Sequence, residues 1–171
     1  LEETQALGWA EQLEQAGNAL PARATLVLPV THSKHLRVEF GALTGISTFM
    51  TGELFEVLRH HSVLRHSVAL DGPDDSEPMA NSDAFTEGVR ASAAPGLAAA
   101  LFQVRSRQVL SGCDPVSNRS FLSGLLIGAE LRSLEAGEGT VILAAGGELR
   151  AAYTRAAAEC GLSGRWTAIE V

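Results

Sequence analysis

Lysine is almost absent from this sequence, which contains only Lys34 among its 171 residues. With 13 basic and 20 acidic side chains the formal net charge is −7, and this argues against a nucleic-acid partner because neutralising phosphates requires clustered Lys and Arg. No apolar run approaches the roughly 20 residues that span a bilayer, so we expect no membrane partner. Together these features predict a soluble, cytoplasmic protein.

Cysteine and aromatic residues are also scarce. Cys113 and Cys160 lie far apart and match no metal-ligand spacing, so they are expected to be buried free thiols. His32 and His35 flank a predicted turn, and no further Cys or His completes a zinc set. Because 46% of residues are hydrophobic and only 5% aromatic, the composition predicts one globular domain with an aliphatic core.

The hydrophobic pattern predicts an α/β fold. The expected elements are a helix over 1–15, strands over 24–29, 35–40 and 44–50, helices from Thr51 and over 81–93, 96–110 and 116–134, a strand over 139–145, a helix over 148–160 and a strand over 165–171. Three consecutive short strands indicate an antiparallel meander, and the closing strand–helix–strand unit indicates parallel pairing. We therefore predict a mixed sheet with helices on both faces. The chain opens inside a helical pattern and closes on a strand, so we expect it to be part of a longer protein.

The first candidate site is the turn between the first two predicted strands. Thr31, His32, Ser33 and Lys34 place hydroxyls, backbone N–H groups and a cation at one point. Such donors suit the phosphate chain of a nucleotide, where charge builds up during transfer. The alternative is a polar β-turn with a solvated lysine.

The second and third candidates are two helix starts. Thr51 and Glu53 flank Gly52 at a predicted helix N-terminus, where an anion could bind; the alternative is an ordinary cap, with Thr51 as N-cap residue and Glu53 complementing the helix dipole. Gly146 and Gly147 follow a buried strand, where α/β proteins usually bind ligands. They do not form the six-residue dinucleotide fingerprint, and a plain strand-to-helix turn is the alternative.

Acidic and histidine pairs supply the remaining candidates. Glu2 or Glu3 could accept a proton from an attacking hydroxyl, or both could simply complement the dipole of the first helix. His60 and His61 lie near a helix end, where cations interact favourably with the dipole; contact with a substrate is the other interpretation.

Several stretches, taken in order, resemble the 2-keto-3-deoxygalactonate kinase family. These stretches are Glu2–Gln5, Leu28–Lys34, Phe49–Phe55 with Leu58, Arg59 and His61–Leu64, and Phe121–Glu130. The combination of a Thr-His-Ser-Lys turn with a Met-Thr-Gly-Glu helix start is the specific part, and the resemblance covers almost the whole chain.

The resemblance implies membership of the sugar kinase, Hsc70 and actin superfamily. Its members consist of two similar ribonuclease H-like lobes, which close around the nucleotide and substrate that bind between them. Residues 1–20 would form an inter-lobe helix and residues 21–171 the C-terminal nucleotide-binding lobe, with the N-terminal lobe absent from this sequence. The intact protein would transfer the γ-phosphate of ATP, bound with Mg²⁺, to a hydroxyl of 2-keto-3-deoxygalactonate. The fragment alone would be inactive, and its exposed apolar face could form a homodimer.

The resemblance also implies roles for particular residues. Thr31–Lys34 would be the second phosphate loop, with Lys34 stabilising the migrating phosphoryl group. Gly146 and Gly147 would lie at the adenosine motif, and Thr51 and Glu53 would contact the substrate. Glu2 or Glu3 would be the catalytic or water-orienting acid.

Two positions in this region depart from the family pattern. Val30 stands where the family has Gly, and a β-branched residue resists positive φ; His35 stands where the family more often has Trp. Two other functions stay open. Val30 and the missing half favour a non-catalytic module that binds nucleotide or sugar acid. The paired acids Glu2 and Glu3 favour an exopolyphosphatase-like phosphohydrolase of the same superfamily.

Overall fold

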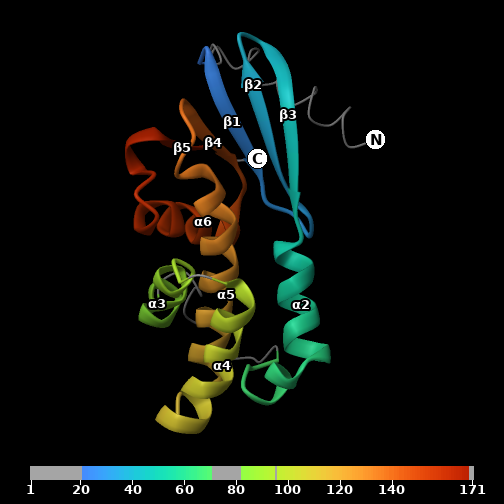
Figure 1. The fold of residues 1–171 in the computed structure, drawn as a ribbon, viewed down its shortest axis with the longest axis vertical. Coiled ribbons are helices and arrows are strands. Elements are labelled where there is room, and N and C mark those ends of the chain that lie inside the picture. Colours follow the sequence, from blue (N-terminus) through green and yellow to red (C-terminus); the bar gives the residue numbers. More distant parts are fainter. Residues whose placement is uncertain (1–20, 71–81, 95, 170–171) are drawn as a thin grey trace.

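One mixed five-stranded sheet organises the computed structural model, which describes residues 21–70, 82–94 and 96–169 (Figure 1). The strands are β1 (Arg23–Leu28), β2 (Ser33–Glu39), β3 (Ala42–Phe49), β4 (Thr140–Ala144) and β5 (Trp166–Ile169). Their spatial order is β3-β2-β1-β4-β5. The pairs β1–β2 and β2–β3 are antiparallel, whereas β1–β4 and β4–β5 are parallel. The predicted α/β class with a mixed sheet is confirmed.

Five α-helices accompany the sheet in the described part of the chain. They are α2 (Thr51–His61), α3 (Asp83–Ala91), α4 (Leu97–Ser111), α5 (Pro115–Leu131) and α6 (Gly147–Glu159). Short 3₁₀ turns occupy Val63–His66, Arg132–Leu134 and Ser163–Arg165. None of these helices is long and apolar enough to cross a membrane. The helix predicted over 1–15 lies outside the described residues.

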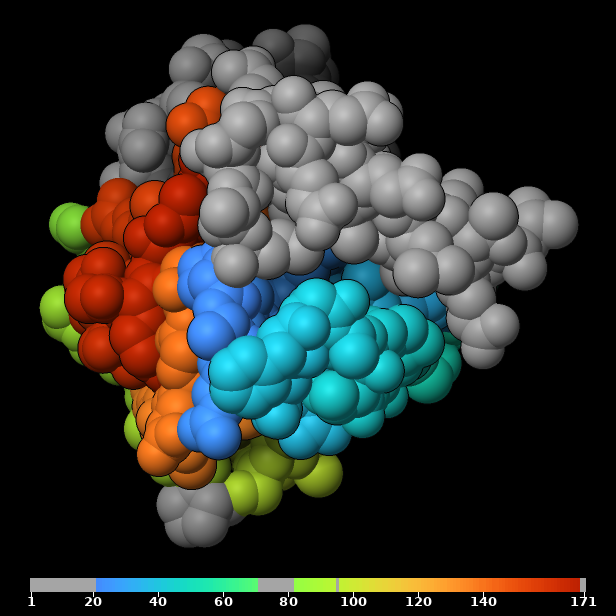
Figure 2. Space-filling view, turned by 90° about the horizontal axis from the view of Figure 1, so that it is seen from above, coloured from blue at the N-terminus to red at the C-terminus, as the bar shows by residue number. Residues whose placement is uncertain are grey.

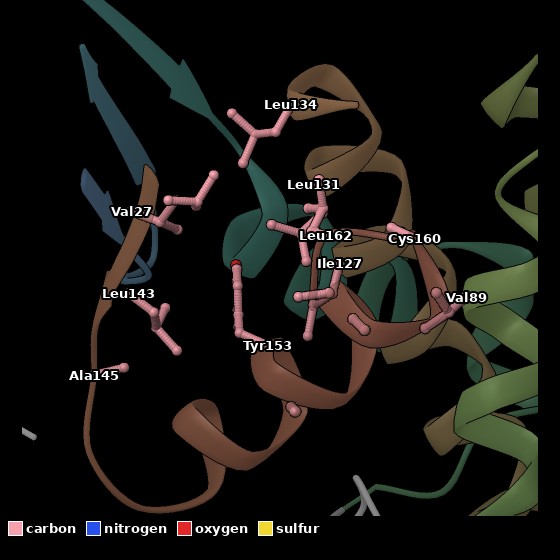
Figure 3. Packing of buried hydrophobic residues seen from close by; sticks show 14 of the residues in the cluster. Val27, Val89, Ile127, Leu131, Leu134, Leu143, Ala145, Tyr153, Cys160 and Leu162 are labelled. Atoms are coloured by element: carbon pink, nitrogen blue, oxygen red, sulfur yellow. The ribbon is translucent and has the colours of Figure 1, made fainter. Parts of the chain in front are cut away.

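The helices of the main core lie against one face of the sheet. Val27, Val141 and Leu143 point from the strands into a cluster with residues of α3, α5 and α6, and Tyr153 stands between Val27 and Ile127 (Figure 3). The alternate strand residues face the other way and form a separate cluster of Ala24, Leu26, Leu36, Ile142 and Ala144. Seen from above, β1–β3 lie beside the segments that carry β4, β5 and α6 (Figure 2). This second cluster contains no residue of a described helix, so the presence of helices on both faces stays a prediction.

Helix α5 runs through the centre of the helical layer in close backbone contact with α3. A Cβ atom added to Gly124 would lie 2.1 Å from the carbonyl oxygen of Phe85, and one added to Gly88 would lie 2.1 Å from that of Phe121. Only glycine fits at such distances, so the two helices touch through their main chains. The result is a tightly held α5, whose last turn carries Glu130 towards the sheet.

Candidate functional site

Three of the predicted ligand-binding segments meet at one edge of the sheet. Strands β1 and β4 are parallel, and β3 runs in the same direction because both β1 and β3 are antiparallel to β2. The carboxyl ends of all three strands therefore share an edge, which is where α/β proteins usually bind ligands. The β1–β2 loop (Pro29–His32), the start of α2 and the start of α6 follow these ends.

The β1–β2 loop packs directly on the first turn of α2. The Glu53 N–H donates to the carbonyl oxygen of Thr31 at 3.2 Å, and His32 Nε2 lies 2.5 Å from a carboxylate oxygen of Glu53. A Cβ atom on Gly52 would lie 3.0 Å from the Thr31 main chain. The absence of a side chain at Gly52 therefore lets the β1–β2 loop pack against the start of α2, where the sequence had predicted a bound ligand.

The tip of this loop is exposed rather than buried in the core. Val30 is 62% accessible, and Thr31 and His32 are also exposed. Among the described non-glycine residues, only Phe40 has a positive φ. The branched side chain of Val30 therefore imposes no left-handed strain on the loop, although the sequence had raised that concern.

A small apolar pocket of about 150 Å³ opens beside the loop. Its walls include Val30 of the loop, Phe55 of α2, Leu126 of α5, and Leu149 and Tyr153 of α6. Ligand pockets in proteins commonly measure roughly 300–1,000 Å³, so this one could enclose only part of a nucleotide or sugar acid.

Beneath this edge lies a buried carboxylate, Glu130, which sequence analysis did not select. Glu130 is 2% exposed. Its Oε1 accepts hydrogen bonds from Ser33 Oγ at 2.7 Å and His35 Nε2 at 2.9 Å. Its Oε2 accepts from Tyr153 OH at 2.9 Å and from Thr51 Oγ1. Side chains of β2, α2 and α6 thus converge on one residue of α5.

The hydrogen bonds keep Glu130 ionised despite its burial. Burial alone would raise the pKa of Glu130, but the hydrogen bonds from His35, Ser33 and Thr51 outweigh it and hold the pKa below its usual value. Burial and then the charge of Glu130 raise the pKa of Tyr153 well above its usual value. The tyrosine is therefore a neutral phenol that donates a hydrogen bond to the carboxylate.

A signal for Glu130 was present in the sequence. It is an acidic residue inside the apolar run of α5, and glutamate is almost never fully buried unless it is paired. Its partners Ser33 and His35 lie 97 and 95 residues away. Sequence spacing therefore gave no means of finding them.

Thr51 does not have the predicted capping role. Helix α2 begins at Thr51, the preceding residue is Met50, and no side chain caps this end. The hydroxyl of Thr51 instead donates to Glu130. The N-cap prediction is therefore wrong, because the helix already includes Thr51 and Met50 occupies the N-cap position. A substrate contact for Thr51 or Glu53 stays a prediction.

The four residues of the predicted phosphate loop do not gather at a single point. Side chains alternate along β2, so Ser33 and His35 face the helical layer, whereas Lys34 lies on the opposite face with Leu36. His32 turns towards Glu53.

The remaining predicted site residues lie in three separate parts of the chain. Gly146 and Gly147 open α6 at the shared edge, and Gly147 has a φ of 53°, which favours glycine. Glu2 and Glu3 lie outside the described residues. His60 and His61 lie at the end of α2, as predicted, and His60 Nε2 lies 3.3 Å from Glu56 one turn earlier. Contact of either histidine with a substrate stays a prediction.

Comparison with known proteins identifies the family. A family model described as 2-keto-3-deoxy-galactonokinase matches residues 2–170. The "Probable 2-dehydro-3-deoxygalactonokinase DgoK1" of Rhizobium meliloti (strain 1021) is 41% identical over 169 residues, which cover 96% of this chain and 52% of the relative. The "2-dehydro-3-deoxygalactonokinase" of Escherichia coli (strain K12) is 36% identical over 159 residues, covering 91% of this chain and 49% of the relative.

A solved structure gives the same result. The crystal structure of a "putative 2-dehydro-3-deoxygalactonokinase protein" from Sinorhizobium meliloti superimposes with a TM-score of 0.79 at 36% identity, covering 94% of this chain and 52% of that one. The chain spans about half the length of the curated relatives it matches. On these matches, the chain belongs to the 2-keto-3-deoxy-galactonokinase family.

Proposed function

We propose that this chain is the C-terminal, nucleotide-binding lobe of a kinase that transfers the γ-phosphate of ATP to 2-keto-3-deoxygalactonate. The observation that carries the proposal is the meeting of the exposed β1–β2 loop with the starts of α2 and α6 at one edge of the sheet. Family membership supports the kinase chemistry. The strand order, with three antiparallel strands followed by parallel β4 and β5, supports a ribonuclease H-like lobe.

In this proposal the loop binds the phosphate chain of ATP. The main chain of Thr31 and His32 and the ammonium group of Lys34 face the triphosphate, and Gly146 and Gly147 let the nucleoside approach the start of α6. A sugar hydroxyl attacks the γ-phosphorus, the bond from that phosphorus to the bridging oxygen breaks, and ADP leaves. The hydroxyl proton passes to a base, for which Glu2 or Glu3 is the candidate. Positioning and electrostatics supply most of the rate.

The proposed site is incomplete within this chain. The pocket of about 150 Å³ beside the loop is too small for either substrate, and a second lobe would have to supply the remaining walls. Mg²⁺ accompanies ATP in such reactions, but the described residues contain no cluster of three His, Cys, Asp or Glu side chains that could hold a metal ion. We therefore assign no metal ligand and no metal-dependent step to them, and we expect the isolated chain to be inactive.

The proposal is tested by measuring ADP formation by the full-length protein with MgATP, with and without 2-keto-3-deoxygalactonate. ADP should form only when the sugar acid is present. Lys34→Ala should lower kcat by about a hundredfold or more, the usual cost of removing one group that stabilises transition-state charge. The matched control is Arg37→Ala, an exposed cation farther along β2, which should change kcat by no more than about twofold. Phosphate release that ignores the sugar acid would contradict the proposal.

A further inference from the structure

The hydrogen bonds around Glu130 connect the end of the β1–β2 loop with the helix on which the loop rests. Ser33 directly follows the loop, and Thr51 begins the helix on which the loop rests. Both hydroxyls donate to Glu130. We propose that Glu130 is the positioning residue of the phosphate-binding loop, and that Ser33 acts through Glu130 rather than by contacting phosphate. This inference rests on the proposed function.

The loop is held at its C-terminal end and through its supporting helix by groups that share this carboxylate. On one side, Ser33 fixes the first residue of β2 against Glu130. On the other, Thr51 fixes the first residue of α2, and Glu53 in the same turn holds the loop through the bond from its N–H to the Thr31 carbonyl oxygen. Displacement of Glu130 would therefore release the loop and its support together.

The remaining two donors keep the carboxylate itself in place. His35 and Tyr153 approach Glu130 from β2 and α6, so each carboxylate oxygen accepts two hydrogen bonds. This uses the acceptor capacity of an ionised carboxylate fully. A buried polar network in which every member is satisfied is rigid and specifies a single arrangement, as a loop that orients a triphosphate requires.

The number of protons that the Ser33 hydroxyl can donate shows whether Ser33 can bind phosphate directly or can only position the loop. A serine hydroxyl has one proton to donate, and that of Ser33 points to Glu130 Oε1 at 2.7 Å. The oxygens of an ionised triphosphate can only accept. Ser33 is also fully buried, so it cannot serve a phosphate without leaving Glu130. The Thr51 hydroxyl also donates a hydrogen bond to Glu130. The main-chain N–H groups of the exposed loop, in contrast, could bind phosphate without giving up a hydrogen bond to Glu130.

Hydrogen exchange in the full-length protein tests the positioning role without using catalysis. Glu130→Gln should speed exchange at the amides of residues 30–34 and 51–53 by about tenfold or more, because two of the four buried donors lose their acceptor. Ser33→Ala, which removes one donor and leaves the fold less perturbed, should have a smaller effect at residues 30–34.

Asn118→Ala provides the matched control. Asn118 is a fully buried polar residue on the same helix, and its side chain donates to the carbonyl oxygens of Ser67 and Val104 instead. This variant should lower the thermal stability without a selective increase in exchange at the loop. If Glu130→Gln leaves exchange at the loop unchanged, or raises it only as uniformly as Asn118→Ala does, the positioning role is refuted.

A double-mutant cycle then tests whether Ser33 acts through Glu130. Ser33→Ala and Glu130→Gln should each raise the KM for MgATP by about tenfold, and the double variant should be no worse than the worse single variant, because both changes release the same loop. If the double variant instead raised the KM about a hundredfold, which is the product of two independent effects, Ser33 would contact ATP directly and the inference would be overturned. Asn118→Ala should leave KM unchanged while lowering the active fraction.

The two measurements also separate this inference from the proposed function. A wild-type protein that forms no ADP in the presence of the sugar acid would remove the kinase assignment. Hydrogen exchange would still decide whether Glu130 holds the loop. A wild-type protein that is active, with Glu130→Gln matching it in both KM and loop exchange, would leave the kinase assignment intact and refute the role of Glu130.

Discussion

The contact between α3 and α5 can be tested by adding one methyl group at Gly124. A Cβ atom there would lie 2.1 Å from the carbonyl oxygen of Phe85 and would have to retreat by about 0.9 Å to reach even 3.0 Å, a distance below which real Cβ contacts are essentially not found. The obstructing atom belongs to a main chain, so no side chain can turn aside. Helix α3 must move, and with it Phe85 and Val89, which are both fully buried in the main core.

The expected cost follows from two opposing terms. Overpacking a filled core costs typically about 1–3 kcal/mol, and a backbone obstacle favours the upper end. Replacing Gly by Ala inside a helix returns about 1 kcal/mol. The net loss of stability should therefore be about 2 kcal/mol, equivalent to roughly 4–8 °C in Tm for a domain of this size.

The assay is thermal unfolding of the full-length protein followed by far-ultraviolet circular dichroism. Gly164→Ala is the matched control, because a Cβ atom there meets nothing within 4 Å and the backbone is not left-handed. This control should change Tm little, or raise it through the lower entropy of the unfolded chain. If Gly124→Ala is as stable as Gly164→Ala, the helices are not in main-chain contact and the reasoning fails.

Two further predictions concern charges on α5. The pKa of Glu130 in the folded protein lies below its ordinary value of 4.5. The contribution of Glu130 to stability should therefore be complete above pH 4.5 and lost as the pH falls through the lower folded pKa. Measurements of Tm against pH should show this loss at acid pH, and Glu130→Gln should make the loss smaller. Asp114 caps the first turn of α5 by accepting from the Val116 and Ser117 N–H groups; Asp114→Ala should cost about 1 kcal/mol in denaturant unfolding, and an unchanged midpoint would contradict the capping role.

The elements of the sheet and helices could be predicted largely from local patterns. The alternation in residues 35–40 and the glycine breaks at 146–147 are properties of neighbouring residues, and the structure has β2 and the start of α6 there. The shared edge could also be expected, because a strand–helix–strand unit implies parallel pairing. The homodimer expectation stays a prediction.

The side-chain directions in the candidate loop could have been deduced but were not. Ser33 and Lys34 are adjacent in a strand, so their side chains must point to opposite faces. The sequence pattern placed all four residues from Thr31 to Lys34 in a turn and so in one phosphate-binding group. In the structure, however, β2 already begins at Ser33. A shift of two residues in the predicted strand boundary therefore changed the expected site.

Glu130 shows where local reasoning fails and why that failure is informative. It lies in the last turn of α5, where the helix dipole disfavours a negative charge, and it is buried, where a carboxylate is costly. Neither local rule is satisfied, and the compensation comes from Ser33, His35, Thr51 and Tyr153 on three other elements. A residue that breaks two local rules persists when tertiary partners outweigh both costs, and such positions are expected at functional or strained sites. The position of Glu130, directly behind the exposed loop and the shared edge, is therefore the strongest reason to examine it first by mutation.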